Sequence, residues 1–329
     1  MIRLTTIDAH SGGASLRLVV SGFPSPSGRT MREKREWADA HLDGLRRALV
    51  LEPRGHADLV GAALTEPVSP GSHAGILFMD RTRYSGLSSH GLIAAATIAI
   101  ERGLLAPGGD HATIQFDTEP GTVRVLVRRG GRAESAACLY VPSFVHEGGL
   151  SIAVGGRQVS VDVIFSGAFY AVVDSEGAGL SLTGRHLPEI RRAGVAVMQA
   201  IDSQHRIVHP VDARLRGIEG VVFTSAAGEG SGGLRSVTVF ADGQIDPSPS
   251  ETGTAALTVL LDAMGLLTTG ISFVHEGLSG ATVRGRVAHR TVVGDQAAIV
   301  PEVESAAWIT GEHQLIADDA DPLAGGFRL

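Results

Sequence analysis

Two eighteen-residue segments of the chain repeat one another, and this repeat limits the possible folds more than any other feature. SSHGLIAAATIAIERGLL begins at Ser88, and SETGTAALTVLLDAMGLL begins 162 residues later at Ser250. The segments align without a gap, with serine in the first position and glycine in the fourth. A helix that is apolar on nearly every side must be buried on all sides. Because the offset is about half of the 329 residues, we expect a duplicated unit in which strands wrap around a buried helix.

The segments around each copy have the patterns of strands and of one amphipathic helix. RLTTIDA, SLRLVVSG and AGILFMD precede the first copy, and RQVSVDVIF, GVVFTSAA and RSVTVFADG precede the second. A capping-box pattern at Thr30 and Glu33 predicts a helix in the first half, and HLPEIRRAGVAVMQAIDSQ predicts one in the second. The sequence therefore predicts an α+β protein with two pseudo-symmetric halves.

Composition excludes several classes of protein. A net charge of -7 argues against a nucleic-acid partner. The single cysteine, Cys138, excludes a disulfide framework or a cysteine-based zinc cluster, and its strand-like surroundings predict a core residue. The start MIRLTTIDAH lacks the pattern of a signal peptide, and the longest apolar run, LIAAATIAI, is too short to span a membrane. We expect a cytoplasmic protein without a membrane partner.

Two motifs match known sites only in spacing. GEGSGG (228–233) has the glycine spacing of a dinucleotide-binding loop, but it lies between two strand-like segments and opens no helix. We interpret it as a hairpin loop. His205 and His209 have the spacing of a metal-binding pair, but Pro210 follows at once and no third ligand is near. We interpret them as a solvated helix end.

The starts of the repeated helices predict an anion site. A helix N-terminus carries partial positive charge and unpaired N–H groups, and Gly91 and Gly253 leave room for a ligand to approach the backbone. If the halves face each other about a pseudo-twofold axis, both helix starts point at one interdomain cleft. Ser88 and Ser250 then flank one carbon atom of a small carboxylate, which suits the transfer of a proton at a stereocentre. Serine is also a favoured N-cap without any function, so both interpretations stay open on the pattern alone.

At these residues the chain resembles the proline racemase superfamily, and more closely its trans-3-hydroxy-L-proline dehydratase branch. The resemblance runs nearly end to end and includes IDAHSGGASLRLVVSGFP, GILFMDRTRYSGLSSHG and VFADGQIDPSPSETGTAA. It implies two halves of the kind also found in diaminopimelate epimerase, each a curled sheet or barrel around a central helix, with the active site in the interdomain cleft. We expect the first half to comprise residues 1–150 with the C-terminal strands at about 303–329, and the second to comprise residues 151–302.

The resemblance also implies roles for individual residues. Ser88 and Ser250 stand at the two catalytic positions, and His90 and Asp246 match the groups that hold the ring nitrogen of the substrate. The peptide N–H groups of Ser89, His90, Glu251 and Thr252 match those that bind the substrate carboxylate, next to the glycines Gly91 and Gly253. The implied partner is a proline-like imino acid, with no cofactor and no metal, and relatives are commonly homodimers.

The chain departs from the family at the catalytic positions. Both are serine, whereas racemases use two cysteines and the dehydratase branch uses a cysteine and a threonine. A serine hydroxyl needs an adjacent base to act, and His90 is the candidate in the motif. Ser89 and Glu251 replace glycines, and Pro247 replaces an arginine. Because a dehydratase needs one base and a group that assists the departing hydroxyl, we expect dehydration of trans-3-hydroxy-L-proline. The alternatives are 4-hydroxyproline epimerase or proline racemase activity, or a catalytically silent binder of proline-like amino acids.

Overall fold

The chain folds into two compact units. The computed structural model describes residues 2–106, 111–129, 133–227, 233–318 and 320–328. One unit comprises residues 1–138 and 306–329, and the other comprises residues 139–305. The first boundary lies before strand β9 (Phe144–Val154), which pairs with the following strand of the second unit from its first residue onward.

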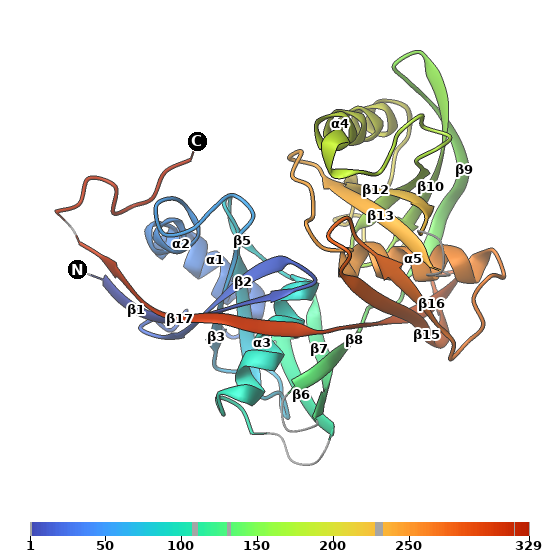
Figure 1. The fold of residues 1–329 in the computed structure, drawn as a ribbon. Coiled ribbons are helices and arrows are strands. Elements are labelled where there is room, and N and C mark those ends of the chain that lie inside the picture. The colour runs from blue at the N-terminus through green and yellow to red at the C-terminus, as the bar shows by residue number, and fades with distance from the viewer. Residues whose placement is uncertain (1, 107–110, 130–132, 228–232, 319, 329) are drawn as a thin grey trace. The chain divides into compact units, whose positions relative to one another are not determined.

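Strands form most of the first unit (Figure 1). Its described strands are β1 (Ile2–Ser11), β2 (Ala14–Ser21), β3 (Val60–Thr65), β4 (Ala74–Met79), β5 (Tyr84–Ser85), β6 (His111–Thr118), β7 (Gly121–Arg129), β8 (Ala133–Leu139) and β17 (Ala307–Ala317). Its helices are α1 (Met31–His41), α2 (Asp43–Val50) and α3 (Ser89–Glu101). The strands pair in the order β17-β1-β2-β3-β4-β6-β7-β8, and β5 pairs with β4. The C-terminal strand β17 thus completes the first unit.

The second unit has the same kinds of element. Its described strands are β9, β10 (Arg157–Phe165), β11 (Phe169–Asp174), β12 (Ile218–Ala226), β13 (Leu234–Phe240), β14 (Ser272–Glu276), β15 (Thr282–Val293) and β16 (Gln296–Ser305). Its helices are the short 3₁₀ helix η1 (Gly184–His186), α4 (Leu187–Gln204) and α5 (Glu251–Ala263). The strands pair in chain order from β9 to β16, and Ser143 exchanges backbone hydrogen bonds with Ile299 of β16 at 2.7 and 2.9 Å. The sheet therefore curls back on itself.

The pairing pattern confirms the predicted duplication. Starting from β1 in one unit and from β10 in the other, successive pairs are antiparallel, parallel, antiparallel, parallel, antiparallel and antiparallel. The first parallel pair is connected through the outer helices, α1 and α2 or α4. The second is connected through α3 or α5, which carry the repeated sequence. A parallel pair needs a crossover connection of this kind, so the repeat in sequence is a repeat in topology.

The repeated helices are the cores of the two units. Residues 91–99 of α3 are all buried, and the helix contacts β1, β2, β3, β7 and β17. Residues 253–259 of α5 are likewise buried, and this helix contacts β9, β10, β11, β15 and β16. Strands thus surround each helix, as the absence of a polar face predicts. The central helices therefore begin at fixed positions in well-packed cores.

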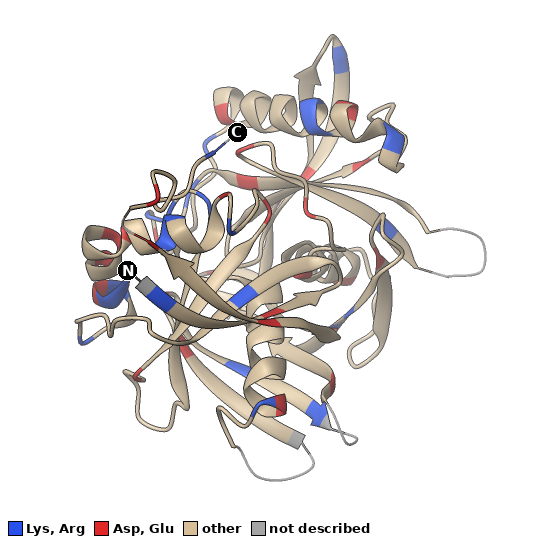
Figure 2. Ribbon diagram, turned by 60° about the vertical axis from the view of Figure 1, so that its left-hand side comes forward, with Lys and Arg blue, Asp and Glu red and all other residues tan. Residues whose placement is uncertain are grey.

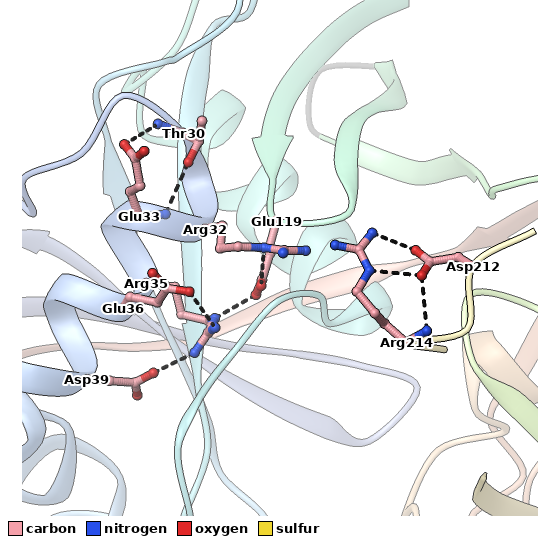
Figure 3. A network of polar contacts seen from close by, with 9 residues as sticks. All are labelled: Thr30, Arg32, Glu33, Arg35, Glu36, Asp39, Glu119, Asp212 and Arg214. Carbon is pink, nitrogen blue, oxygen red and sulfur yellow. Dashed lines mark hydrogen bonds and ion pairs between the residues drawn. The ribbon is translucent and has the colours of Figure 1, made fainter. Parts of the chain in front are cut away.

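The outer helices have one apolar face each. Five residues of α4 are buried against β9, β12 and β13, namely Ile190, Gly194, Val197, Met198 and Ile201. The predicted capping box is present at the start of α1, where Glu33 N donates to Thr30 Oγ1 at 3.2 Å. Arg35 of α1 also donates to Glu119 at 2.7 Å and to Asp39 at 2.6 Å (Figure 3). The contact with Glu119 attaches α1 to the turn between β6 and β7.

Charged residues of both signs are interspersed over the described chain (Figure 2). Among the described helices, none is long and apolar enough to cross a membrane.

Candidate active site

In the first unit, Ser88 is the N-cap of α3. Its backbone is extended, with φ of -140°, and its Oγ accepts a hydrogen bond from Gly91 N at 3.3 Å. Gly91 is packed closely, because a Cβ there would lie 2.6 Å from the Phe78 ring and 2.9 Å from Ser88 Oγ. The missing side chain at position 91 therefore makes room for an aromatic ring of β4 as well as for the serine hydroxyl.

His90 lies beside the Ser88 hydroxyl. Its ring nitrogens Nδ1 and Nε2 are 3.4 and 3.5 Å from Ser88 Oγ. These distances are longer than those of a strong hydrogen bond, so the contact between the imidazole and the hydroxyl is weak. Ser89, the first residue of α3, is buried. An imidazole is thus the acid–base group within reach of the first serine.

In the second unit, Ser250 is the N-cap of α5. Its Oγ accepts a hydrogen bond from Gly253 N at 3.1 Å and lies 3.1 Å from Thr252 Oγ1. The two hydroxyls at the helix starts therefore accept the same bond from a glycine three residues on. Their neighbours differ, because the position of His90 is taken by Thr252 in the second helix.

Asp246 is connected to Ser250 through Ser248. Asp246 Oδ1 accepts from Ser248 N at 2.9 Å and from Ser248 Oγ at 2.6 Å. Ser248 Oγ in turn accepts from Ser250 N at 2.9 Å. An aspartate carboxylate that accepts hydrogen bonds from the residue two positions later stabilises a local turn of the backbone. Asp246 is half-buried, and its side chain orients the approach to α5.

Tyr170 of β11 extends the polar cluster at Ser250. Its side chain hydrogen-bonds Thr252, and burial raises the pKa of the phenol well above its usual range. Tyr170 is therefore a neutral phenol near physiological pH. Thr252 joins it to Ser250, so two uncharged hydroxyl groups continue the cluster from the second serine.

A buried histidine lies beneath the first turn of α5. Thr254 Oγ1 donates to Ser250 O at 2.8 Å and lies 2.7 Å from His275 Nδ1. His275 Nε2 is 2.7 Å from Ser236 Oγ. Burial lowers the pKa of His275 to about 3, so its ring is neutral. The helix start is thus connected through hydrogen bonds to β14 and β13.

The structure places each predicted site residue at or near one of these helix starts. Ser88, Ser89, His90 and Gly91 lie together in the first unit. In the second unit the members are Asp246, Ser250, Glu251, Thr252 and Gly253. Glu251 is buried in the first turn of α5, which favours a negative charge.

Sequence reasoning missed the residues that support Ser250. They are Tyr170, Ser236, Ser248, Thr254 and His275. A threonine four residues after an N-cap is a local signal, because its hydroxyl reaches the carbonyl of the preceding turn. Tyr170, Ser236 and His275 come from distant strands, and no local pattern marks them.

Other interpretations of the sequence have mixed outcomes. Cys138 is buried, as predicted. The expected solvated helix end is wrong for His209, which is buried against the rings of Phe144 and Phe165 because the chain turns inward after α4. Residues 228–232 of the glycine-rich loop lie outside the described residues, and the strands that flank them form an antiparallel pair. Across the described ranges, no group of three or more His, Cys, Asp or Glu residues is arranged to hold a metal ion.

Comparison with known proteins identifies relatives over the whole chain. The profile of the family described as Proline racemase matches residues 6–328. A trans-3-hydroxy-L-proline dehydratase of Bacillus cereus is 39% identical over 99% of this chain and 98% of its own. A proline racemase of Clostridioides difficile is 33% identical over 99% and 98% of the two chains. A crystal structure of a hydroxyproline epimerase from Agrobacterium vitis, with bound trans-4-hydroxy-L-proline, has a TM-score of 0.89 and 27% identity over 100% of this chain and 95% of its own. These matches confirm the resemblance and the fold class.

Proposed function

The chain belongs to the proline racemase family, and from this premise we propose that it removes the α-proton of a proline-like imino acid without a cofactor. The proposed reaction is dehydration of trans-3-hydroxy-L-proline. The dehydratase of Bacillus cereus, at 39% identity, supports this choice among the activities of the relatives.

One observation carries the proposal. Each repeated helix begins with a serine whose hydroxyl accepts a bond from a glycine N–H, at 3.3 Å in α3 and 3.1 Å in α5, but only the first serine has an imidazole beside it. The two hydroxyls are therefore equivalent in position and different in chemistry. One base and one neutral acid are what a dehydration needs.

Ser88 and His90 form the proposed base. A serine hydroxyl alone holds its proton too tightly to accept one from carbon, so it needs a neighbouring group to take its own proton. His90 lies 3.4 Å from Ser88 Oγ through Nδ1. In the proposed reaction the α C–H bond breaks, and its proton passes to this pair.

Ser250 is the proposed acid on the second helix. Thr252 and the neutral Tyr170 phenol supply donors next to the Ser250 hydroxyl. The bond between the ring carbon and its hydroxyl breaks, and the departing hydroxide takes a proton from Ser250 to leave as water. The electron pair of the α C–H bond forms the double bond of an enamine, which isomerises to a cyclic imine. Asp246 is the proposed partner of the ring nitrogen.

Glu251 distinguishes this chain from the pattern of its family. Its carboxylate is buried in the first turn of α5, where the substrate carboxylate is proposed to bind. Like charges at such a site repel, so we expect Glu251→Gly to lower KM roughly tenfold, since about 1.4 kcal/mol corresponds to a factor of ten. Glu251→Gln removes the charge and keeps the volume. In the same steady-state assay it therefore distinguishes repulsion between charges from steric crowding by the side chain. A KM that rises in both variants would show that Glu251 supports binding.

Proton NMR in heavy water tests the proposed reaction. The protein is incubated with trans-3-hydroxy-L-proline, trans-4-hydroxy-L-proline and L-proline, and the α-proton signal is followed. We expect loss of the 3-hydroxy compound with formation of the imine. Deuterium incorporation with inversion in the other two compounds would favour an epimerase or racemase. No change in any of the three compounds, together with thermal stabilisation by ligand, would favour a silent binder.

The homodimer and the cytoplasmic location stay predictions.

A further inference from the structure

The backbone of Ser250 adopts an unfavourable conformation. Its φ is +65°, and no other non-glycine residue among those that the structure describes has a positive φ. Such a conformation costs on the order of 1–3 kcal/mol and persists only where surrounding contacts enforce it. Its counterpart Ser88 has an ordinary extended backbone with φ of -140°. The second helix start therefore needs support that the first does not need.

Hydrogen bonds hold Ser250 on both sides of its Cα. On one side, its N–H donates to Ser248 Oγ at 2.9 Å. On the other, its carbonyl accepts from Thr254 N at 2.7 Å and also from Thr254 Oγ1 at 2.8 Å. The carbonyl of Ser88 accepts from Leu92 N at 2.9 Å, and leucine has no hydroxyl to add a second bond. The extra donor at the second helix start is the hydroxyl of Thr254.

Ser236, His275, Thr254 and Ser250 form a buried chain of hydrogen bonds. The direction of these bonds follows from the number of hydrogens on the Thr254 hydroxyl. A threonine hydroxyl has one hydrogen, and that of Thr254 is used on the carbonyl of Ser250. Thr254 Oγ1 must therefore accept from His275, so Nδ1 carries the ring proton and Nε2 accepts from Ser236. All three donors point the same way, from Ser236 through His275 and Thr254 to Ser250. Bonds aligned in this way polarise and strengthen one another.

The first unit shows that the fold does not require this chain of hydrogen bonds. Within the helices, Leu92 corresponds to Thr254 at the offset of 162 residues. In the strands, Ala74 of β4 and Leu234 of β13 start the equivalent parallel pairs, so Ile76 corresponds to Ser236 by register. Leu92 and Ile76 are both buried and apolar. An apolar core thus supports one copy of the helix, whereas the other copy buries a polar chain that ends on the residue with positive φ. Buried polar groups are unfavourable unless they are bonded, so the second unit carries a requirement that packing alone does not explain.

We propose that Thr254 and His275 are positioning residues that act through the carbonyl of Ser250 to fix the direction of its hydroxyl. This inference rests on the proposed role of Ser250 as an acid. The His275 ring orients Thr254, Thr254 holds the carbonyl of Ser250, and the held backbone directs Oγ. Neither residue needs to touch the substrate.

Matched variants separate positioning from core packing. Thr254→Val removes the hydroxyl at nearly constant volume, and Thr254→Ser keeps it. His275→Asn keeps a donor where Nδ1 stands, and His275→Gln keeps an acceptor where Nε2 stands but loses the donor to Thr254. We expect Thr254→Val and His275→Gln to lower kcat roughly 10- to 100-fold at nearly constant KM, as small displacements of a reacting group do. Thr254→Ser and His275→Asn are expected to retain most of kcat at similar melting temperatures.

A substrate-free measurement keeps this inference separate from the proposed function. A thiol introduced by Ser250→Cys in a Cys138→Ala background reports its own pKa through the ultraviolet absorbance of the thiolate. A thiol held at a helix N-terminus has a lowered pKa. We expect Thr254→Val to raise that pKa and Thr254→Ser to leave it low. Long-range ¹H–¹⁵N NMR of the parent protein should show His275 protonated on Nδ1.

The outcomes decide the two proposals independently. Equal thiol pKa values in the valine and serine variants, or a proton on Nε2 of His275, would overturn the positioning role whatever the enzyme turns over. Absence of turnover in the parent protein, with the expected thiol and NMR results, would count against the proposed reaction alone and support the positioning of Ser250.

Discussion

Gly91 in the first turn of α3 lies directly against the ring of Phe78 in β4. A Cβ at position 91 would stand 2.6 Å from Phe78 Cε1, which is closer than real Cβ contacts occur, and 3.1 Å from Cδ1, which is closer than most of them. Phe78 is fully buried, so its ring cannot move aside without disturbing the core. The absence of a side chain at position 91 is therefore a requirement of core packing.

We expect Gly91→Ala to lower the free energy of unfolding by about 1–3 kcal/mol, as overpacking of a core does. Chemical denaturation measures the change. Gly44→Ala in α2 is the control, because a Cβ there meets nothing within 4 Å. That substitution should raise stability by about 0.5–1 kcal/mol, since alanine favours a helix over glycine. Equal effects at both positions would show that the Phe78 contact does not limit position 91.

Ser88→Ala should affect both stability and catalysis. Loss of an N-cap costs about 0.5–2 kcal/mol, and loss of the proposed base should lower kcat roughly 100- to 10,000-fold. Thr30→Ala removes the N-cap of α1, far from either helix start in sequence, and serves as the control. It should cost similar stability in thermal unfolding and leave kcat unchanged. A Ser88→Ala enzyme that keeps its kcat would leave Ser88 with the capping role only.

Substitution by glycine should affect stability differently at Ser250 and at Ser88. Glycine adopts positive φ without strain, and alanine does not. We expect Ser250→Gly to be more stable than Ser250→Ala. This difference should exceed the difference between Ser88→Gly and Ser88→Ala by about 1–2 kcal/mol. Urea unfolding of the four variants measures both differences. Similar differences at the two positions would mean that the φ of +65° carries no cost in solution.

His275 should make stability fall as the pH falls. Burial holds the pKa of His275 at about 3, below its ordinary value of 6.5. Between these values the unfolded chain binds a proton and the folded protein does not, so unfolding is favoured by about 1.4 kcal/mol for each pH unit below 6.5. Above pH 6.5 the ring is neutral in both states and contributes no pH dependence.

Unfolding of the parent protein and His275→Asn at a series of pH values measures this contribution. The two curves should run parallel above pH 6.5 and the parent should lose stability faster below it. Parallel curves throughout would mean that His275 takes up its proton without unfolding. His146 and His209 also have lowered pKa values through burial and remain in both proteins, so they cancel in the comparison.

Local patterns were sufficient for the repeated architecture. The apolar helices, their serine caps and the capping box at Thr30 are encoded within a few residues, because capping and hydrophobic periodicity depend on neighbours in the chain. An alignment of the two copies also predicts that α3 and α5 occupy equivalent positions in their sheets. The burial of His209 did not follow in this way, since rings from β9 and β10 cover it.

The two repeats predict two buried helices that begin with a serine and a glycine, in halves of one topology. The differences between the two helix starts come from tertiary contacts. Ser250 has a positive φ and a buried chain of hydroxyls and imidazole, whereas Ser88 has an extended backbone and His90 beside it. Ser236 and His275 reach α5 from strands that are adjacent in space and distant in sequence. Hydrogen bonds between such residues exist only after the sheet has closed around the helix.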